Sequence, residues 1–100
     1  MNNTISEKNK EKVIRREVVK EDNALHEYTL TEKESTHVAS FHLPLYSIKV
    51  EMVLGGEKTE AQLSDCFANK MKAEKFFDKL VRNLATPYDL IYVFEDSVTV

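Results

Sequence analysis

The stretch "YSIKVEMVLGGEKTEAQL", residues 46–63, decides the fold because it combines a regular alternation of side chains with the chain's two glycines. Alternation of apolar and polar residues is typical of a β-strand with one buried face. The apolar set is Tyr46, Ile48, Val50, Met52 and Leu54. If Gly55 and Gly56 are the central residues of a tight turn, the chain returns as an antiparallel strand. This register pairs Met52 with Thr59, Val50 with Ala61 and Ile48 with Leu63, all on the apolar face.

The two glycines do not match a phosphate-binding loop. Such a loop needs a first glycine five residues before a Gly-Lys-Ser/Thr ending and a helix directly behind it. Here Glu57 separates Gly56 from Lys58, and a strand-like segment follows. The positive φ angles of a hairpin turn explain both glycines without any ligand.

Two further strands are predicted before this hairpin. Residues 12–20, "KVIRREVVK", are rich in β-branched residues that favour a strand, although their apolar positions also fit one helical stripe. Asp22 and Asn23 then offer turn chemistry. The next segment alternates as a strand with Ala24, His26, Tyr28 and Leu30 on one face. Residues 34–43 are ambiguous, and we expect Pro44 to end whatever they form, because proline lacks a backbone donor.

The period changes to that of a helix after Leu63. Asn69 is placed to cap an amphipathic helix. Its apolar stripe is Met71, Phe77, Leu80, Val81 and Leu84. A second helix start follows, with Thr86 as the cap, Pro87 in the first turn and Asp89 reaching back as in a capping box.

These elements predict an α+β fold, in which a four-stranded antiparallel meander is followed by two C-terminal helices packed on one face. A chain of 100 residues has room for one core. Residues 1–11 are polar and are expected to form a disordered tail. Residues 12–100 are then a single domain.

The span from Leu45 to Asp96 carries a set of short motifs. They are a Tyr46–Ile48 strand start, a polar-ended hairpin, a lysine-rich helix, a Pro87–Leu90 helix start and the acidic pair Glu95–Asp96. In these features the span resembles a family of small uncharacterised proteins of spore-forming Gram-positive anaerobes, known only as a domain of unknown function. That family usually has glycine where this chain has Ser47. The resemblance implies no known activity, so it assigns no catalytic residue.

Charge, cysteine content and the lengths of apolar runs argue against several classes of function. A net charge of -3 gives no overall field that attracts nucleic acid or anionic lipid. The single cysteine makes no internal disulfide, and no signal-peptide pattern is present, so we expect a reducing cytoplasm. No apolar run approaches the roughly 20 residues of a membrane-spanning helix.

No group of chemically active residues converges in the sequence. The candidate nucleophile and ligand set is Cys66, His26, His37 and His42. Their spacing matches no zinc pattern, and Asp65 beside Cys66 raises rather than lowers a thiol pKa. The acidic residues Glu27, Glu32, Glu51 and Glu60 are interpreted as the wet face of a sheet. We therefore predict no catalysis, no metal and no cofactor.

The remaining hypothesis is a small protein-interaction module that binds another protein or a second copy of itself. In the last helix Leu90, Ile91, Phe94 and Val98 are expected to face the sheet. Tyr88 and Tyr92 lie off that face beside Val93, and these three residues are the predicted interaction site. The alternative is weak nucleic-acid binding by basic residues of the first strand and the lysine-rich helix. Contact with a membrane is not expected.

Overall fold

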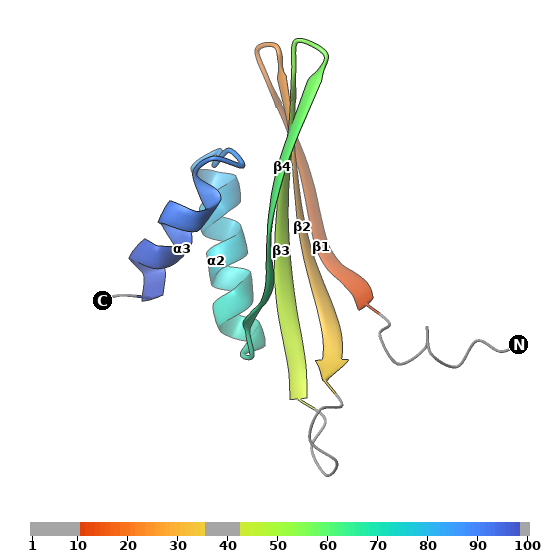
Figure 1. Ribbon diagram of the computed structural model, residues 1–100, viewed down its shortest axis with the longest axis vertical. Coiled ribbons are helices and arrows are strands. Elements are labelled where there is room, and N and C mark those ends of the chain that lie inside the picture. The colour runs from red at the N-terminus through yellow and green to blue at the C-terminus, as the bar shows by residue number, and fades with distance from the viewer. Residues whose placement is uncertain (1–10, 36–42, 99–100) are drawn as a thin grey trace, which may run out of the picture.

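The computed structural model describes residues 11–35 and 43–98, which form two layers (Figure 1). One layer is an antiparallel sheet in the order β1-β2-β3-β4, and the helices α2 and α3 cover one of its faces. The elements are β1 (Glu11–Glu21), β2 (Ala24–Ser35), β3 (Leu43–Leu54), β4 (Glu57–Phe67), α2 (Lys70–Arg82) and α3 (Leu90–Val98). The predicted meander and helical layer are confirmed. Of the tail predicted over residues 1–11, only Glu11 lies within the described residues, and it begins β1.

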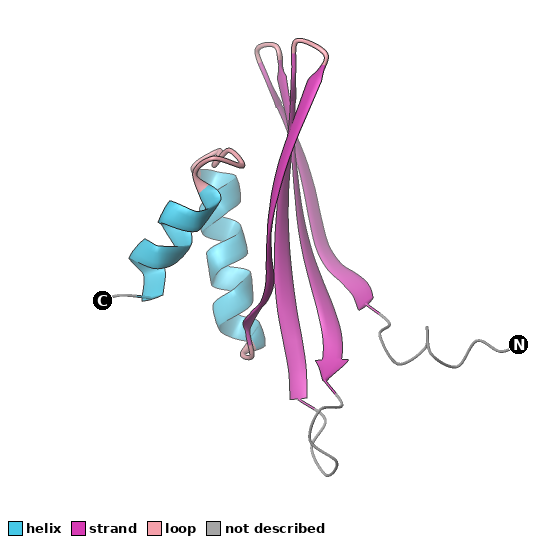
Figure 2. Cartoon of the chain, in the orientation of Figure 1, coloured by secondary structure: helices cyan, strands magenta, loops and turns pink. Residues whose placement is uncertain are grey.

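The β3–β4 hairpin has the register that the sequence predicts. Met52 pairs with Thr59, Val50 with Ala61 and Ile48 with Leu63. Gly55 has φ 60° and Gly56 has φ 83°, and a Cβ atom at either position would meet nothing within 4 Å. The turn therefore needs glycine for its backbone conformation and not for space. Both β-hairpin turns lie at the same end of the sheet (Figure 2).

The β1 segment is a strand and not the alternative helix, and its turn to β2 passes through Asp22 at φ 53°. A register shift between Val13 and Arg15 interrupts its pairing with β2. Beyond the shift Arg15 lies opposite Leu30, a buried residue on the helix side. The shift thus directs an arginine toward the helices, which the simple alternation does not predict.

The prediction that Pro44 ends a preceding element is wrong. Leu43 and Pro44 are the first two residues of β3, and Pro44 lies opposite Glu34 near the end of β2. The pairing of β3 with β4 extends from Leu54 only as far as Tyr46, so Pro44 has no partner in β4. The missing N–H of Pro44 therefore costs no hydrogen bond to β4, since proline is tolerated where no ladder partner is present. Of the ambiguous segment 34–43, residues 36–42 lie outside the described residues.

The core lies between the sheet and the two helices. Its buried members from the sheet are Tyr28, Leu30, Tyr46, Ile48 and Val50, and those from the helical layer are Ala73, Phe76, Phe77, Leu80, Ala85 and Leu90. The Tyr28 hydroxyl donates to the Ala85 carbonyl at 2.8 Å, which joins β2 to the segment between α2 and α3. Because both groups are buried, this bond satisfies polar atoms that water does not reach.

Helix α2 begins as predicted, with the Asn69 Oδ1 accepting the Lys72 N–H at 3.0 Å. The predicted apolar stripe is wrong at Met71, which is 69% exposed. Met71 lies about 120° around the helix axis from Phe77, so it points away from the sheet. Phe76 takes the buried position instead. Leu84 lies beyond the end of the helix with φ 51°.

Helix α3 is preceded by the predicted capping interaction, because the Asp89 carboxylate accepts the Thr86 N–H at 3.0 Å. Leu90 is buried, but Ile91 is 43% exposed, so the prediction that Ile91 faces the sheet is wrong. The face of α3 that packs against the core consists of Val93, Leu90 and Phe94. Ile91 lies about 100° around the helix axis from Leu90, at the edge of this face. The side chain of Val98 lies outside the described part of the chain.

Candidate interaction surface

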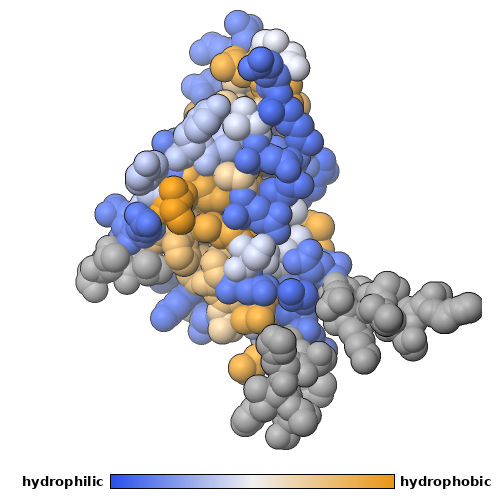
Figure 3. All heavy atoms as spheres, viewed as in Figure 1, coloured by the Kyte–Doolittle hydropathy of each residue, from blue (hydrophilic) through white to orange (hydrophobic). Residues whose placement is uncertain are grey.

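The outer face of α3 and the turn before it expose three large side chains that do not contribute to the core. Tyr88, Ile91 and Tyr92 are 66%, 43% and 71% exposed. Tyr88 lies in the turn that precedes α3, and Ile91 and Tyr92 lie in the first turn of the helix. We call these three residues the α3 outer face. In Figure 3 the apolar atoms gather over the helical layer, next to charged residues of the sheet.

Val93 lies at the edge of this surface. It is half-buried and packs against the core, yet it also lines an open hollow of about 540 Å³ with Tyr92, Glu95 and Asp96. Its inner atoms hold α3 in place, and its outer atoms border the hollow. The structure thus places the predicted residues Tyr92 and Val93 on α3 and Tyr88 in the turn before it, with the tyrosines outermost.

The charges around the α3 outer face are acidic. Glu95 and Asp96 line the hollow beside Tyr92, and the last turn of α3 contains no basic residue.

The opposite face of the sheet presents a second polar surface. Glu27, Glu51 and Glu60 lie in one row, directly opposite one another on β2, β3 and β4. Each has a basic partner. The ion pairs are Arg16–Glu27 at 2.6 Å, Lys58–Glu51 at 2.8 Å, and Lys49 and Lys58 with Glu60 at 3.8 Å each.

The hydrogen bond from Lys58 lowers the pKa of Glu51 below its ordinary value. A depressed pKa keeps this carboxylate ionised at neutral pH, so it is not a proton donor there. The row therefore forms a network of ion pairs across the sheet. Glu32 departs from the predicted wet face, because it lies opposite Tyr46 and accepts the Tyr46 hydroxyl at 3.0 Å. Its strand position has the parity of Leu30, which places it on the helix side.

A model of the family of unknown function DUF6514 matches residues 6–100. The chain belongs to this family. The match extends well beyond the span from Leu45 to Asp96 that carries the motif resemblance. No curated protein and no solved structure matches the chain. None of the described helices of this DUF6514 member is long and apolar enough to cross a bilayer.

The single cysteine of this DUF6514 member is a half-buried structural thiol. Its Sγ donates to the carbonyls of Tyr46 and Leu63, each at 3.6 Å, and the residue packs against the core. Burial raises the pKa of Cys66 to about 11, and the charge of Asp65 acts in the same direction. Because the thiolate is the reactive form, Cys66 is a poor nucleophile at neutral pH.

The histidines form no metal site within residues 11–35 and 43–98, where no group of three metal-ligating side chains occurs. His26 is 4% exposed and stacks on Tyr28 with ring centroids 6.3 Å apart. Its Nδ1 has no hydrogen-bond partner among the described residues. His37 and His42 lie outside the described residues.

Proposed function

We propose that this DUF6514 protein is a small interaction module that binds another protein or a second copy of itself through the α3 outer face. The observation that supports this proposal is the exposure of Tyr88 and Tyr92, at 66% and 71%, next to Ile91. Tyrosine combines a large apolar ring with a polar tip, and it is enriched in protein interfaces. The proposed activity involves no catalysis and no cofactor.

The fold itself does not account for these side chains. Leu90 and Phe94 hold α3 against the rest of the core, while Tyr92 lies on the far side of the helix. Truncation of an exposed side chain away from such packing usually changes stability by less than about 0.5 kcal/mol. Three large exposed side chains within two turns therefore favour a binding role over a structural one.

We expect the module to act in the cytoplasm, because its one cysteine is a free, half-buried thiol and not part of a disulfide. The acidic border at Glu95 and Asp96 favours a partner surface with lysine or arginine around an apolar patch.

The test compares Tyr92→Glu with Met71→Glu, which places the same charge on another exposed apolar residue of the helical layer. Sedimentation velocity on each protein up to about 1 mM reports self-association. We expect Tyr92→Glu to abolish association and Met71→Glu to retain it, with unchanged circular dichroism for both. An association that survives Tyr92→Glu, or that both variants weaken equally, contradicts the proposal.

A heterologous partner requires a second arm of the experiment. A photo-crosslinking amino acid at position 92 is compared with the same group at position 71 in cells that express the protein. We expect a discrete adduct from position 92 alone, lost when Tyr88 is also changed to Glu. A wild-type protein that stays monomeric and gives the same adducts from both positions contradicts the interaction role.

The alternative of weak nucleic-acid binding receives less support from the geometry. Arg15 and Arg16 of β1 are ion-paired to Asp78 and Glu27, and Lys12 lies 3.8 Å from Glu32. The basic residues of the first strand are therefore largely neutralised by carboxylates. The lysines of α2 are then the residues that would contact the phosphate groups in this alternative. A gel shift at low salt tests this alternative, because binding by these lysines weakens steeply with added salt.

A further inference from the structure

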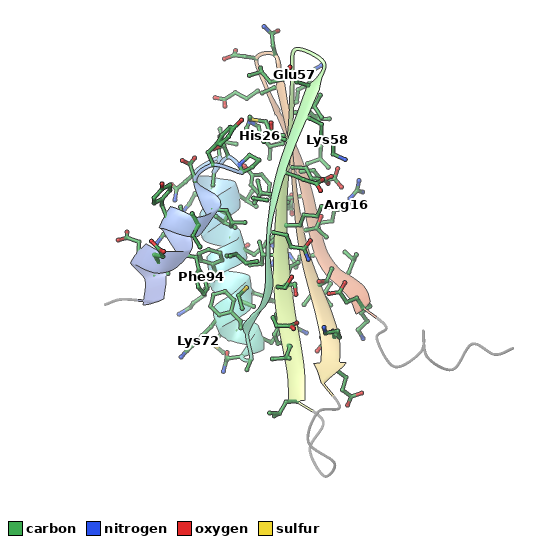
Figure 4. All side chains as sticks on the ribbon, viewed as in Figure 1. Arg16, His26, Glu57, Lys58, Lys72 and Phe94 are labelled. Atoms are coloured by element: carbon green, nitrogen blue, oxygen red, sulfur yellow. The ribbon has the colours of Figure 1, made fainter. Side chains whose placement is uncertain are left out.

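A groove between the end of β4, helix α2 and the end of α3 combines apolar walls with a basic rim. It encloses about 460 Å³. The lining residues are Phe67, Phe76, Lys72, Lys75, Lys79 and Ser97, and we call this site the Lys–Phe groove. In Figure 4, Phe94 lies on the side of α3 that faces α2, and Lys72 lies near the start of α2.

Phe67 and Phe76 form a preorganised floor for the groove, and Phe94 packs against both rings. Phe67 and Phe76 have ring centroids 5.4 Å apart, and Phe94 contacts them edge-on at 5.7 and 5.8 Å. Edge-to-face contacts of this kind fix the ring orientations. Because the three rings come from β4, α2 and α3, the floor exists only in the folded protein.

The rim has a positive charge that the described residues do not neutralise. Lys72, Lys75 and Lys79 follow one another at helical spacing along α2, and Lys79 donates to the Ser97 hydroxyl at 3.3 Å. The Lys72 and Lys75 ammonium groups have no ion-pair or hydrogen-bond partner among residues 11–35 and 43–98. Lys33, Lys49 and Lys58 on the sheet are each paired to a carboxylate. Unpaired ammonium groups beside an aromatic floor therefore distinguish this site.

We propose that the Lys–Phe groove binds a small amphipathic anion, with a flat apolar body mainly on the half-buried Phe67, beside the small exposed part of Phe76, and an anionic head group at Lys72 and Lys75. The volume is within the range of roughly 300–1,000 Å³ that small-molecule sites occupy. Charge complementarity requires the negative head group, and the aromatic floor favours a ring or a short acyl body. This site uses none of the residues of the α3 outer face, so it is independent of the proposed interaction role.

Two fluorescent probes test the proposal on the intact protein. One is 8-anilinonaphthalene-1-sulfonate, which has the proposed chemistry, and the other is N-phenyl-1-naphthylamine, which has nearly the same rings without the charge. We expect saturable binding of one molecule of the anionic probe, with at least about tenfold weaker binding of the neutral one. Added salt should weaken only the anionic probe.

Two double variants with the same loss of charge provide the control. Lys72→Gln with Lys75→Gln removes both free rim charges, whereas Lys20→Gln with Lys70→Gln removes two exposed charges outside the groove. We expect the first pair to raise the Kd of the anionic probe about tenfold, since exposed charge contacts contribute modestly each. The second pair should leave the Kd unchanged.

Amide chemical-shift mapping on the unmodified protein locates the bound probe even if the double variant fails to fold. The largest shifts should fall on Phe67, residues 72–79 and Ser97. Binding mapped to the α3 outer face or the open sheet face overturns the proposal. Equal affinity for both probes, equal effects of the two variants, or no saturable binding up to about 1 mM also overturns it.

Discussion

At the scale of single residues, two polar contacts tie the two layers together, one exposed and one buried. Arg15 reaches from β1 to α2, where its guanidinium lies 4.8 Å from the centroid of the Phe77 ring and pairs with Asp78 at 2.8 Å. The Tyr28 hydroxyl reaches from β2 to the carbonyl of Ala85, which follows the C-terminal end of α2 in the chain. Both side chains cross from the sheet to the helical layer, so each fixes how the helices lie on the sheet.

Replacement of Tyr28 by Phe tests the buried hydrogen bond. The change leaves the Ala85 carbonyl without its donor, so we expect a loss of about 1–3 kcal/mol in the free energy of unfolding. Urea titration measures this quantity. Thr29→Val, on the opposite face of the same strand, is the control and should cost less, because Thr29 is not fully buried. Equal stability of Tyr28→Phe and wild type contradicts the importance of this bond.

The same tyrosine predicts a loss of stability at high pH. Burial raises the pKa of Tyr28 to about 12 in the folded protein, above its ordinary value of 10.0. The unfolded chain therefore loses this proton first, and the contribution of Tyr28 is complete below pH 10 and declines as pH rises toward 12. We expect urea stability to fall more steeply across this window in wild type than in Tyr28→Phe. Parallel curves for the two proteins contradict this prediction.

At the scale of elements, the β3–β4 hairpin was predictable in register, because two local signals agree. The alternation from Tyr46 to Leu54 defines a face, and the paired glycines define the turn. The position of Arg15 was not predictable, since a register shift of one residue leaves no mark on composition or period. The contact among Phe67, Phe76 and Phe94 at the Lys–Phe groove was also not predictable from the sequence. The three residues come from three elements and meet only in the tertiary structure.

The hairpin turn predicts a contrast between two substitutions. Replacing Gly55 and Gly56 together with Val should destabilise the protein by about 1–2 kcal/mol per residue, because β-branched side chains resist positive φ. Gly55→Asn should cost much less, since asparagine followed by glycine suits this turn type. Thermal melting of the three proteins measures the difference. A double valine variant with the wild-type melting temperature contradicts the tight-turn geometry.

At the scale of the whole molecule, the sheet has one face packed against helices and one face covered by ion pairs. The Glu27–Glu51–Glu60 row spans three strands, and Arg16 on β1 extends its ion network to the fourth. Antiparallel sheets commonly have one solvated face, which the alternating sequence predicted. Glu32 lies on the helix side because its strand position has the parity of Tyr28 and Leu30, so extending the alternation of β2 by one step predicts this placement, and there it accepts the Tyr46 hydroxyl.

The charged row predicts how stability responds to acid. The hydrogen bond from Lys58 lowers the pKa of Glu51 in the folded protein, so the unfolded chain takes up this proton first as pH falls. The contribution of Glu51 is therefore present above its ordinary pKa of 4.5 and is lost as pH falls below it. We expect Glu51→Gln to flatten the acid limb of a stability profile measured by urea titration. An acid limb of Glu51→Gln that is as steep as that of the wild type contradicts the assignment.

The register irregularities of β1 and β4 have a consequence for solubility. An outermost strand with a straight row of free N–H and C=O groups is a template for endless addition of further chains, as in fibrils. Both outermost strands here are broken, β1 between Val13 and Arg15 and β4 near Asp65, where φ is 52° and the N–H donates to the Ser47 hydroxyl. A straight incoming strand meets an irregularity on either edge of the sheet, so continuous pairing along the whole edge is interrupted. These irregularities thus work against polymerisation through the sheet edges.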